Sequence, residues 1–346
     1  MPTSTHHVVL GNGIAGNHAA DVIRKRDPNS RITIISAGAL LFYNRYDLPN
    51  VFRGRHQWVD YLVHPPEYYE SQNITLRRKT RVVELEPQAQ TLSLAHRETL
   101  HYDKLLIATG GHAYIPARLL DDVGLMHSFH NFRVAMQVQS AVRKNGTVIM
   151  LGGDVMGLDL ARTIIATGHR VIVALDNRTF WPHEIAQSER ARYLQALESM
   201  GLDVRDHGKV DHIEAGNSKG PARQVFFEDG SEIRGDVVMP FFGLVPTVDF
   251  LATSGIDMER GILVNPQLQT ARDNIWAAGD VCQIWSATSN AYRFYYGYRN
   301  VKMMGEVAAY NMTGEQSPFE STVDEALEVT SKGLLHSPFW EYDQRG

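Results

Sequence analysis

Residues 8–20 read VVLGNGIAGNHAA: three strand-forming residues run directly into the glycine pattern GxGxxG, and a helix-forming stretch follows. Between a strand and a helix, this pattern is typical of a dinucleotide-binding turn. Gly11 permits the tight turn, Gly13 lets the backbone approach a pyrophosphate, and Gly16 lets the helix pack close to the strand. The helix N-terminus offers free N–H groups and a partial positive charge to the phosphates. We therefore predict that this part of the chain binds a dinucleotide.

The same strand–turn–helix plan occurs a second time in the chain. Residues 147–161 read TVIMLGGDVMGLDLA, and a buried strand is predicted after them at residues 170–176. Each unit closes on a buried strand that ends in glycine, YDKLLIATG at residues 102–110 and DVVMPFFG at residues 236–243. The repeat is longer than those of solenoid proteins. The sequence therefore predicts an α/β protein with two related dinucleotide-binding modules, the second inserted in the first.

Composition narrows the class of protein. The chain has 346 residues, enough for two domains, and a formal net charge of −5, so bulk electrostatics favour no nucleic-acid partner. Cys282 is the single cysteine, which excludes a disulfide or a cysteine-ligated metal cluster within one chain. The histidines show no HxxxH or HExxH spacing, so we expect no metal site. With no secretory leader and no apolar stretch long enough to span a bilayer, we expect a cytoplasmic protein.

The end of the second strand of each module is unusual. A dinucleotide fold normally carries an acid there for the adenosine ribose. The first module has Ser36 at this point, so a hydroxyl or backbone groups must take the role of the acid. The second module has Leu175 in the usual position, and Asp176 beside it is the candidate for the ribose.

Four motifs, GNGIAG, LLIATG, LGGDVMG and AAGDV, stand in the order found in the pyridine nucleotide-disulfide oxidoreductase superfamily of flavoproteins, which the chain resembles over nearly its whole length. The resemblance implies two nested Rossmann-like domains of the glutathione-reductase type. These would be an FAD-binding domain at residues 1–112 and 245–314, an NAD(P)-binding domain at residues 113–244, and a C-terminal tail at residues 315–346 left from an interface domain. Residues 42–49, FYNRYDLP, are most similar to the branch of NADH:rubredoxin reductases and the flavin part of nitrite reductase.

The resemblance also implies roles for particular residues. Arg45 would lie near the isoalloxazine, Asp159 would replace the family's glutamate near the nicotinamide, and Asp280 would bind the ribityl chain. Val82 would contact the adenine through its backbone. The predicted FAD-binding residues are Gly11, Gly13, Ile14, Ala15, Gly16, Ser36, Arg45, Val82, Ala108, Thr109, Gly110, Gly279 and Asp280. The predicted NAD(P)-binding residues are Gly152, Gly153, Asp154, Val155, Met156, Gly157, Asp176 and Gly243.

Departures from the family pattern shape the expected chemistry. Disulfide and peroxide-reducing members carry cysteine in the stretch that matches residues 43–48, and this chain has none there. Cys282 is interpreted as a packed residue, so the flavin itself must pass electrons onward.

In the second glycine turn, Asp154 replaces the middle glycine of the motif. Its bulk and charge next to a pyrophosphate are expected to cost about 1 kcal/mol, roughly tenfold in affinity. We expect NAD(P)H to be used nevertheless, with NADH slightly favoured. The short tail is expected to leave the flavin open to a protein carrier or to require another subunit, which makes an oligomer a further expectation.

The sequence thus predicts an FAD-dependent NAD(P)H oxidoreductase. It would take hydride from NAD(P)H onto the flavin and pass electrons to a rubredoxin- or ferredoxin-like protein or to an associated iron–sulfur enzyme. One alternative is an FAD-bearing accessory subunit of a redox complex with a degenerate nicotinamide site. Another is an NADH oxidase that makes peroxide. The sequence names neither the acceptor nor the oligomeric state.

Overall fold

The computed structural model describes residues 4–216, 222–321 and 327–340. The chain forms two compact units. Unit 1 comprises Met1–Asn44, Leu62–Gly111 and Pro246–Val323, and unit 2 comprises Arg45–Tyr61, His112–Val245 and Asp324–Gly346. The division into domains predicted above stays a prediction, and parts of it (residues 1–3, 217–221, 322–326 and 341–346) lie outside the described residues.

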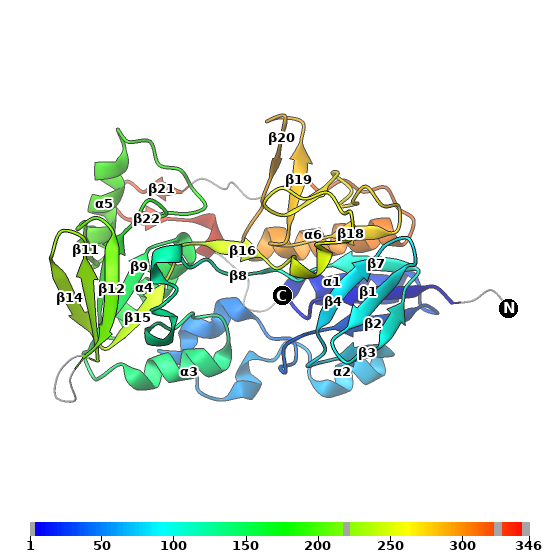
Figure 1. Cartoon of the computed structure of the whole chain (residues 1–346), viewed down its shortest axis with the longest axis horizontal. Helices are drawn as coiled ribbons and strands as arrows, with labels where there is room; N and C mark the ends of the chain where they lie inside the picture. The colour runs from blue at the N-terminus through cyan, green and yellow to red at the C-terminus, as the bar shows by residue number, and fades with distance from the viewer. Residues whose placement is uncertain (1–3, 217–221, 322–326, 341–346) are drawn as a thin grey trace. The chain divides into compact units, whose positions relative to one another are not determined.

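Unit 1 is built on a parallel sheet with the strand order β18-β7-β1-β2-β3 (Figure 1). Its strands are β1 (His6–Leu10), β2 (Arg31–Ile35), β3 (Ile74–Arg77), β7 (Lys104–Ile107) and β18 (Ile275–Ala277). Every residue of β1 is buried, as expected for the central strand of a parallel sheet that is covered on both faces. The glycine turn therefore leaves the middle of the sheet, the usual place for a dinucleotide.

The remaining elements of unit 1 surround this sheet. They are α1 (Ile14–Arg26), α2 (Pro66–Ser71), α6 (Tyr298–Met312), the antiparallel strands β4 (Val82–Glu86), β5 (Thr91–Leu94) and β6 (Thr99–His101), and the small sheet of β17 (Ile262–Val264), β19 (Cys282–Ser286) and β20 (Ala291–Arg293).

Unit 2 repeats the plan with a parallel sheet in the order β11-β10-β9-β15. Its strands are β9 (Thr147–Gly152), β10 (Arg170–Leu175), β11 (Asp203–Arg205) and β15 (Val237–Pro240). Its other main elements are the short helix η1 (Arg45–Val51), α3 (Phe132–Ala141), α4 (Val155–Ala166), α5 (Arg190–Ser199), and the antiparallel strands β12 (Val210–Ala215), β13 (Arg223–Phe227) and β14 (Glu232–Gly235). The prediction of two α/β modules of one plan is confirmed, since β9–α4–β10 matches β1–α1–β2.

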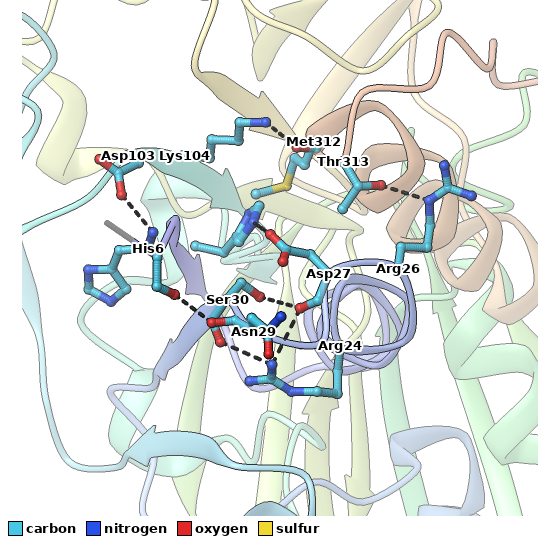
Figure 2. A network of polar contacts seen from close by, with 12 residues as sticks. His6, Arg24, Arg26, Asp27, Asn29, Ser30, Asp103, Lys104, Met312 and Thr313 are labelled. Atoms are coloured by element: carbon cyan, nitrogen blue, oxygen red, sulfur yellow. Dashed lines mark hydrogen bonds and ion pairs between the residues drawn. The ribbon is translucent and has the colours of Figure 1, made fainter. Parts of the chain in front are cut away.

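A polar network ties together the amino-terminal edge of the sheet in unit 1 (Figure 2). The backbone N–H of His6 donates to Asp103 at 2.6 Å, and the ammonium group of Lys104 donates to the carbonyl oxygen of Met312 at the end of α6. The guanidinium of Arg24, in the last turn of α1, donates to the carbonyl oxygen of Ser30 at 3.0 Å. A cation suits this helix end. Hydrogen bonds from polar side chains thus connect the segments at this edge. The opposite edge of the sheet, where β1 leads into its glycine turn, is where a dinucleotide normally binds.

The packing of α6 on α1 depends on Gly305. A Cβ atom at this position would lie 2.3 Å from the carbonyl oxygen and 2.8 Å from the Cα atom of Ala15, both backbone atoms that cannot turn aside. We predict that Gly305→Ala forces the helices apart and lowers the free energy of unfolding by roughly 1–3 kcal/mol, measured by urea denaturation.

The control for this prediction is Gly38→Ala in the same unit. The nearest atom that its Cβ would meet is the Ser36 hydroxyl oxygen at 3.5 Å, an ordinary contact. Equal denaturation midpoints for the two variants would contradict the proposed helix contact.

Candidate functional site: two glycine turns with opposite surroundings

The first glycine turn has the backbone geometry that its motif requires. Gly11 has φ of +123°, and a Cβ atom there would lie 2.0 Å from the carbonyl oxygen of Ala108. A Cβ at Gly16 would lie 2.1 Å from the carbonyl oxygen of Gly11. Side chains are therefore excluded at both positions, one for the turn and one for the approach of α1 to the strand.

The N-terminus of α1 is open. Gly13 is the N-cap residue, and no side chain caps the helix. Gly11, Asn12, Gly13 and Ile14 are all half-buried, so solvent reaches the turn. Uncapped N–H groups at an accessible helix N-terminus suit an anion such as a pyrophosphate. The chemistry of this turn thus fits the dinucleotide that the motif predicts.

The strands next to β1 bring further predicted FAD residues to the same edge. Residues 108–110 follow β7, and Gly279 and Asp280 follow β18. Since β18, β7 and β1 are parallel neighbours, their carboxyl ends meet at one edge of the sheet. Ser36 follows β2, and its hydroxyl accepts from the N–H of Gly38 at 3.2 Å. Val82 begins β4, outside this sheet.

Arg45 belongs to the other unit. It begins η1, whose residues pack with unit 2, whereas the first glycine turn lies in unit 1. Its predicted place near the isoalloxazine stays a prediction.

The second glycine turn begins with a glycine of positive φ, as the first turn does, but it has a different residue at the helix N-cap. Gly152 has φ of +92°, and a Cβ there would lie 2.4 Å from the carbonyl oxygen of Phe241. Asp154 takes the N-cap position of α4, where the first module has Gly13. Its carboxylate accepts from the N–H groups of Gly157 at 2.8 Å and Gly243 at 2.9 Å. The carboxylate of Asp154 therefore caps α4 and takes the N–H of Gly157, a helix N-terminal donor of the kind that a pyrophosphate uses.

Burial controls the ionisation of Asp154. The side chain is only 4% exposed, and this burial raises its pKa to about 6 against the lowering effect of the N–H groups of Gly157, Gly243 and Met156.

The loop after β10 closes over this turn. The N–H of Val155 donates to the carbonyl oxygen of Trp181 at 3.0 Å, and the N–H of Phe180 donates to the carbonyl oxygen of Gly153 at 2.9 Å. Gly152, Gly153, Asp154 and Val155 are consequently all buried, in contrast to their half-buried counterparts in the first turn. No motif in the sequence predicts this closure. Its only sign was the bulky run 180–182, Phe-Trp-Pro, shortly after the predicted ribose-binding acid.

Two predicted acids of unit 2 are already engaged by arginines. Asp176 pairs with Arg118 at 2.8 Å. Asp159, on α4, pairs with Arg162 at 3.1 Å. Burial raises the pKa of Asp159 to about 6, while Arg162 and Arg53 lower it. Of the other predicted nucleotide residues, Met156 in the first turn of α4 is half-buried.

Cys282 is a packed residue. It is 1% exposed, its thiol donates to the carbonyl oxygen of Gly279 at 3.4 Å, and burial raises its pKa well above the usual range. Among residues 4–216, 222–321 and 327–340, no cluster of three or more His, Cys, Asp or Glu side chains is placed to hold a metal. Over the same described ranges, no helix is long and apolar enough to cross a membrane.

Residues 5–294 match the family model for pyridine nucleotide-disulphide oxidoreductases. The NADH-rubredoxin oxidoreductase of Clostridium acetobutylicum is 27% identical over 322 residues, which cover 92% of this chain and 78% of the relative. The subunit epsilon of the NADH-dependent phenylglyoxylate dehydrogenase of Aromatoleum evansii is 24% identical over 318 residues, which cover 90% of this chain and 73% of the relative. The structure of the covalent putidaredoxin reductase–putidaredoxin complex superposes with a TM-score of 0.81 at 22% sequence identity. The superposition covers 92% of this chain and 77% of that one, and it shows that the two share a fold.

Fold and motifs thus define a two-module flavin and nicotinamide dinucleotide oxidoreductase. The chain belongs to the pyridine nucleotide-disulphide oxidoreductase family. It is an FAD-dependent NAD(P)H oxidoreductase, and the predictions of family, fold class, enzyme class and cofactor are confirmed. With no redox disulfide available, it works through the flavin alone. The roles of individual site residues stay predictions.

Asp154→Asn tests the buried carboxylate through the pH dependence of stability. Folding raises this pKa from 3.8 to about 6, so between these values the folded chain binds more protons than the unfolded chain and loses stability as the pH rises. The Asn variant lacks this proton. The unfolding free energy of the natural chain minus that of the variant should therefore fall by on the order of 2 kcal/mol between about pH 4 and pH 6.5 and stay level above.

Urea denaturation at a series of pH values measures this difference. A difference that is the same at every pH would show that Asp154 titrates alike in both states.

Proposed function

We propose that the chain carries electrons from NADH through FAD to a small one-electron protein of the rubredoxin or iron–sulfur type. The observation that supports this most directly is the burial of the Cys282 thiol. The single thiol is buried in unit 1, hydrogen-bonded to two backbone carbonyls, and not available as a relay. Electrons that reach the flavin must therefore leave it directly, and a one-electron protein is the acceptor that suits a flavin without a thiol.

The chain's own residues would bind and orient the reactants. The N–H groups of the first turn of α1, at Ile14 and Ala15, would hold the FAD pyrophosphate, with Ser36 at the adenosine end and Asp280 toward the ribityl chain. FAD, when bound, supplies the exchange between two-electron and one-electron transfer. In unit 2, Asp159 would orient the nicotinamide ring.

We also propose which residues bind each cofactor, what kind of protein accepts the electrons, and where the protein is located. We place FAD binding in residues 1–112 and 245–314 and nicotinamide binding in residues 113–244. The relatives' names specify rubredoxin and putidaredoxin as acceptors of those proteins, which supports a carrier of this size for the present chain. We further propose a cytoplasmic location, since a chain with one buried cysteine needs no oxidising compartment.

A second candidate function is favoured by one observation. The buried second glycine turn, with its donors taken by Asp154 and Trp181, is what an FAD-bearing subunit without a working nicotinamide site would show. One relative is itself named as a subunit of a larger dehydrogenase. Reduction by nicotinamide nucleotides separates the two functions.

Anaerobic stopped-flow mixing of the FAD-loaded chain with NADH, and separately with NADPH, makes this test. Bleaching of the oxidised flavin band near ~450 nm by NADH is expected, because the chain has both modules of the family. A flavin that dithionite reduces and neither nucleotide reduces would contradict the proposed function and leave the accessory subunit.

Asp154→Gly tests the cost of the capped turn. The variant removes a negative charge and releases the N–H groups of Gly157 and Gly243, so the Kd for NADH is expected to fall roughly tenfold. Asp154→Asn is the matched control, since it removes the charge and keeps an acceptor at the cap, and it should give a smaller gain. An unchanged Kd in the Gly variant would show that the carboxylate does not hinder the nucleotide.

A further inference from the structure

The C-terminal segment packs on α5 and α4 of unit 2. Its hairpin, β21 (Glu328–Val329) and β22 (Leu335–His336), lies beside α5 (Figure 1). The Tyr193 hydroxyl donates to the carbonyl oxygen of Leu327 at 2.6 Å, and the guanidinium of Arg192 donates to that of Val329 at 3.0 Å. The hairpin thereby delivers a final turn, η6 (Pro338–Trp340), to α4.

Trp340 is seated at the N-terminus of α4. Its indole N–H donates to the carbonyl oxygen of Val155 at 2.7 Å, and the guanidinium carbon of Arg162 lies 4.7 Å from the centroid of its ring. Trp340 is 9% exposed. A tryptophan with its donor satisfied and a cation on its ring is a specific contact, not a loosely placed chain end.

Phe339 fastens the loop that closes the glycine turn. It is 3% exposed, and its ring stacks on that of His183 with centroids 5.5 Å apart and an angle of 24° between the planes. His183 ends the loop of residues 178–183, which also contains Trp181. The same final turn thus holds both α4 and the loop that lies on it.

The peptide groups of Val155 are therefore engaged on both sides. Its N–H donates to Trp181 in the loop, and its carbonyl oxygen accepts from Trp340 in the final turn. A dinucleotide pyrophosphate needs the N–H groups at this helix N-terminus. It can reach the N–H of Val155 only when the loop moves away, and the loop is held by Phe339.

From this geometry we propose that residues 337–340 are a built-in cover of the nicotinamide-nucleotide site, which must leave α4 before the nucleotide binds. The proposal rests on the proposed function, since it describes the regulation of that site. Arg162 connects the cover to the predicted nicotinamide residue, because its guanidinium stacks on the Trp340 ring and pairs with the carboxylate of Asp159. Release of the cover would free this arginine from Trp340 and remove Phe339 from the loop that holds the N–H of Val155.

The cover should lower the apparent affinity for the nucleotide by the fraction of molecules in which it is released. Trp340→Ala removes the indole hydrogen bond and the stack on Arg162. Binding of ADP-ribose, which has the pyrophosphate and no reducing ring, is measured by calorimetry on the FAD-loaded chain. The Kd is expected to fall roughly tenfold in Trp340→Ala. Trp340→Phe keeps a ring for Arg162 and should give a smaller decrease.

Two further variants complete the design. A chain that ends at Ser337 keeps the hairpin on α5 and loses η6, so it should bind ADP-ribose as Trp340→Ala does. Trp285→Ala is the control for loss of an indole, because Trp285 is 36% exposed on β19 of unit 1, and it should leave the Kd unchanged. FAD content and circular dichroism check the folding of each chain.

Hydrogen exchange on the natural chain tests the cover without a substitution. ADP-ribose should speed exchange at the indole N–H of Trp340 and at the backbone amides of Ser337, Phe339 and Trp340. Unchanged or weaker ADP-ribose binding in both Trp340→Ala and the shortened chain, or no change in exchange at saturating ADP-ribose, overturns the cover. Failure of NADH to reduce the flavin overturns the proposed function instead, so the two failures are distinct.

Discussion

The N–H groups at the start of a helix must find acceptors, and the structure of each module depends on where its helix finds them. In α1 the N-cap is a glycine without a side chain, so the donors remain for a ligand. In α4 the N-cap is Asp154, whose carboxylate accepts from the helix N–H of Gly157 and from Gly243 outside the helix, while a loop carbonyl accepts from the helix N–H of Val155. The change from Gly13 in the first module to Asp154 in the second thus distinguishes an open anion site from a site whose donors the protein itself occupies.

This difference has a consequence for electron flow. The uncapped, solvent-accessible turn of unit 1 leaves its N–H groups to the pyrophosphate of a resident cofactor. The corresponding turn of unit 2 is capped by Asp154 and covered by the loop of residues 178–183, and the proposed cover would have to leave it before a nicotinamide co-substrate binds. The acids Asp154 and Asp159 lie five residues apart in the first half of α4, and burial raises the pKa of both. The stability of unit 2 therefore depends on pH through these two carboxyl groups.

Much of the fold followed from local pattern. The glycines at 11, 16 and 152 are required by backbone contacts under 2.5 Å that any Cβ would make, and such requirements are visible as a motif. Strand and helix order followed from apolar runs and from the repeat of one plan. The position of Asp154 was also identified from the motif, and its effect on nucleotide affinity stays a prediction, but the hydrogen bond of its carboxylate to Gly243 was not expected. A side chain at an N-cap can project or fold back, and the neighbouring Gly243 that receives it is distant in sequence.

The sequence by itself determined the two modules, the family, the flavin and the absence of a thiol relay, because each rests on residue identity within a short stretch. Only the tertiary structure decided that the second turn is filled. The loop of residues 178–183 supplies an acceptor to the N–H of Val155, and the final turn at residues 337–340 supplies a donor to the carbonyl oxygen of Val155. No spacing rule connects these two segments to α4. Contacts between distant segments depend on packing, which minimises buried unpaired polar groups across the whole unit and leaves no local pattern.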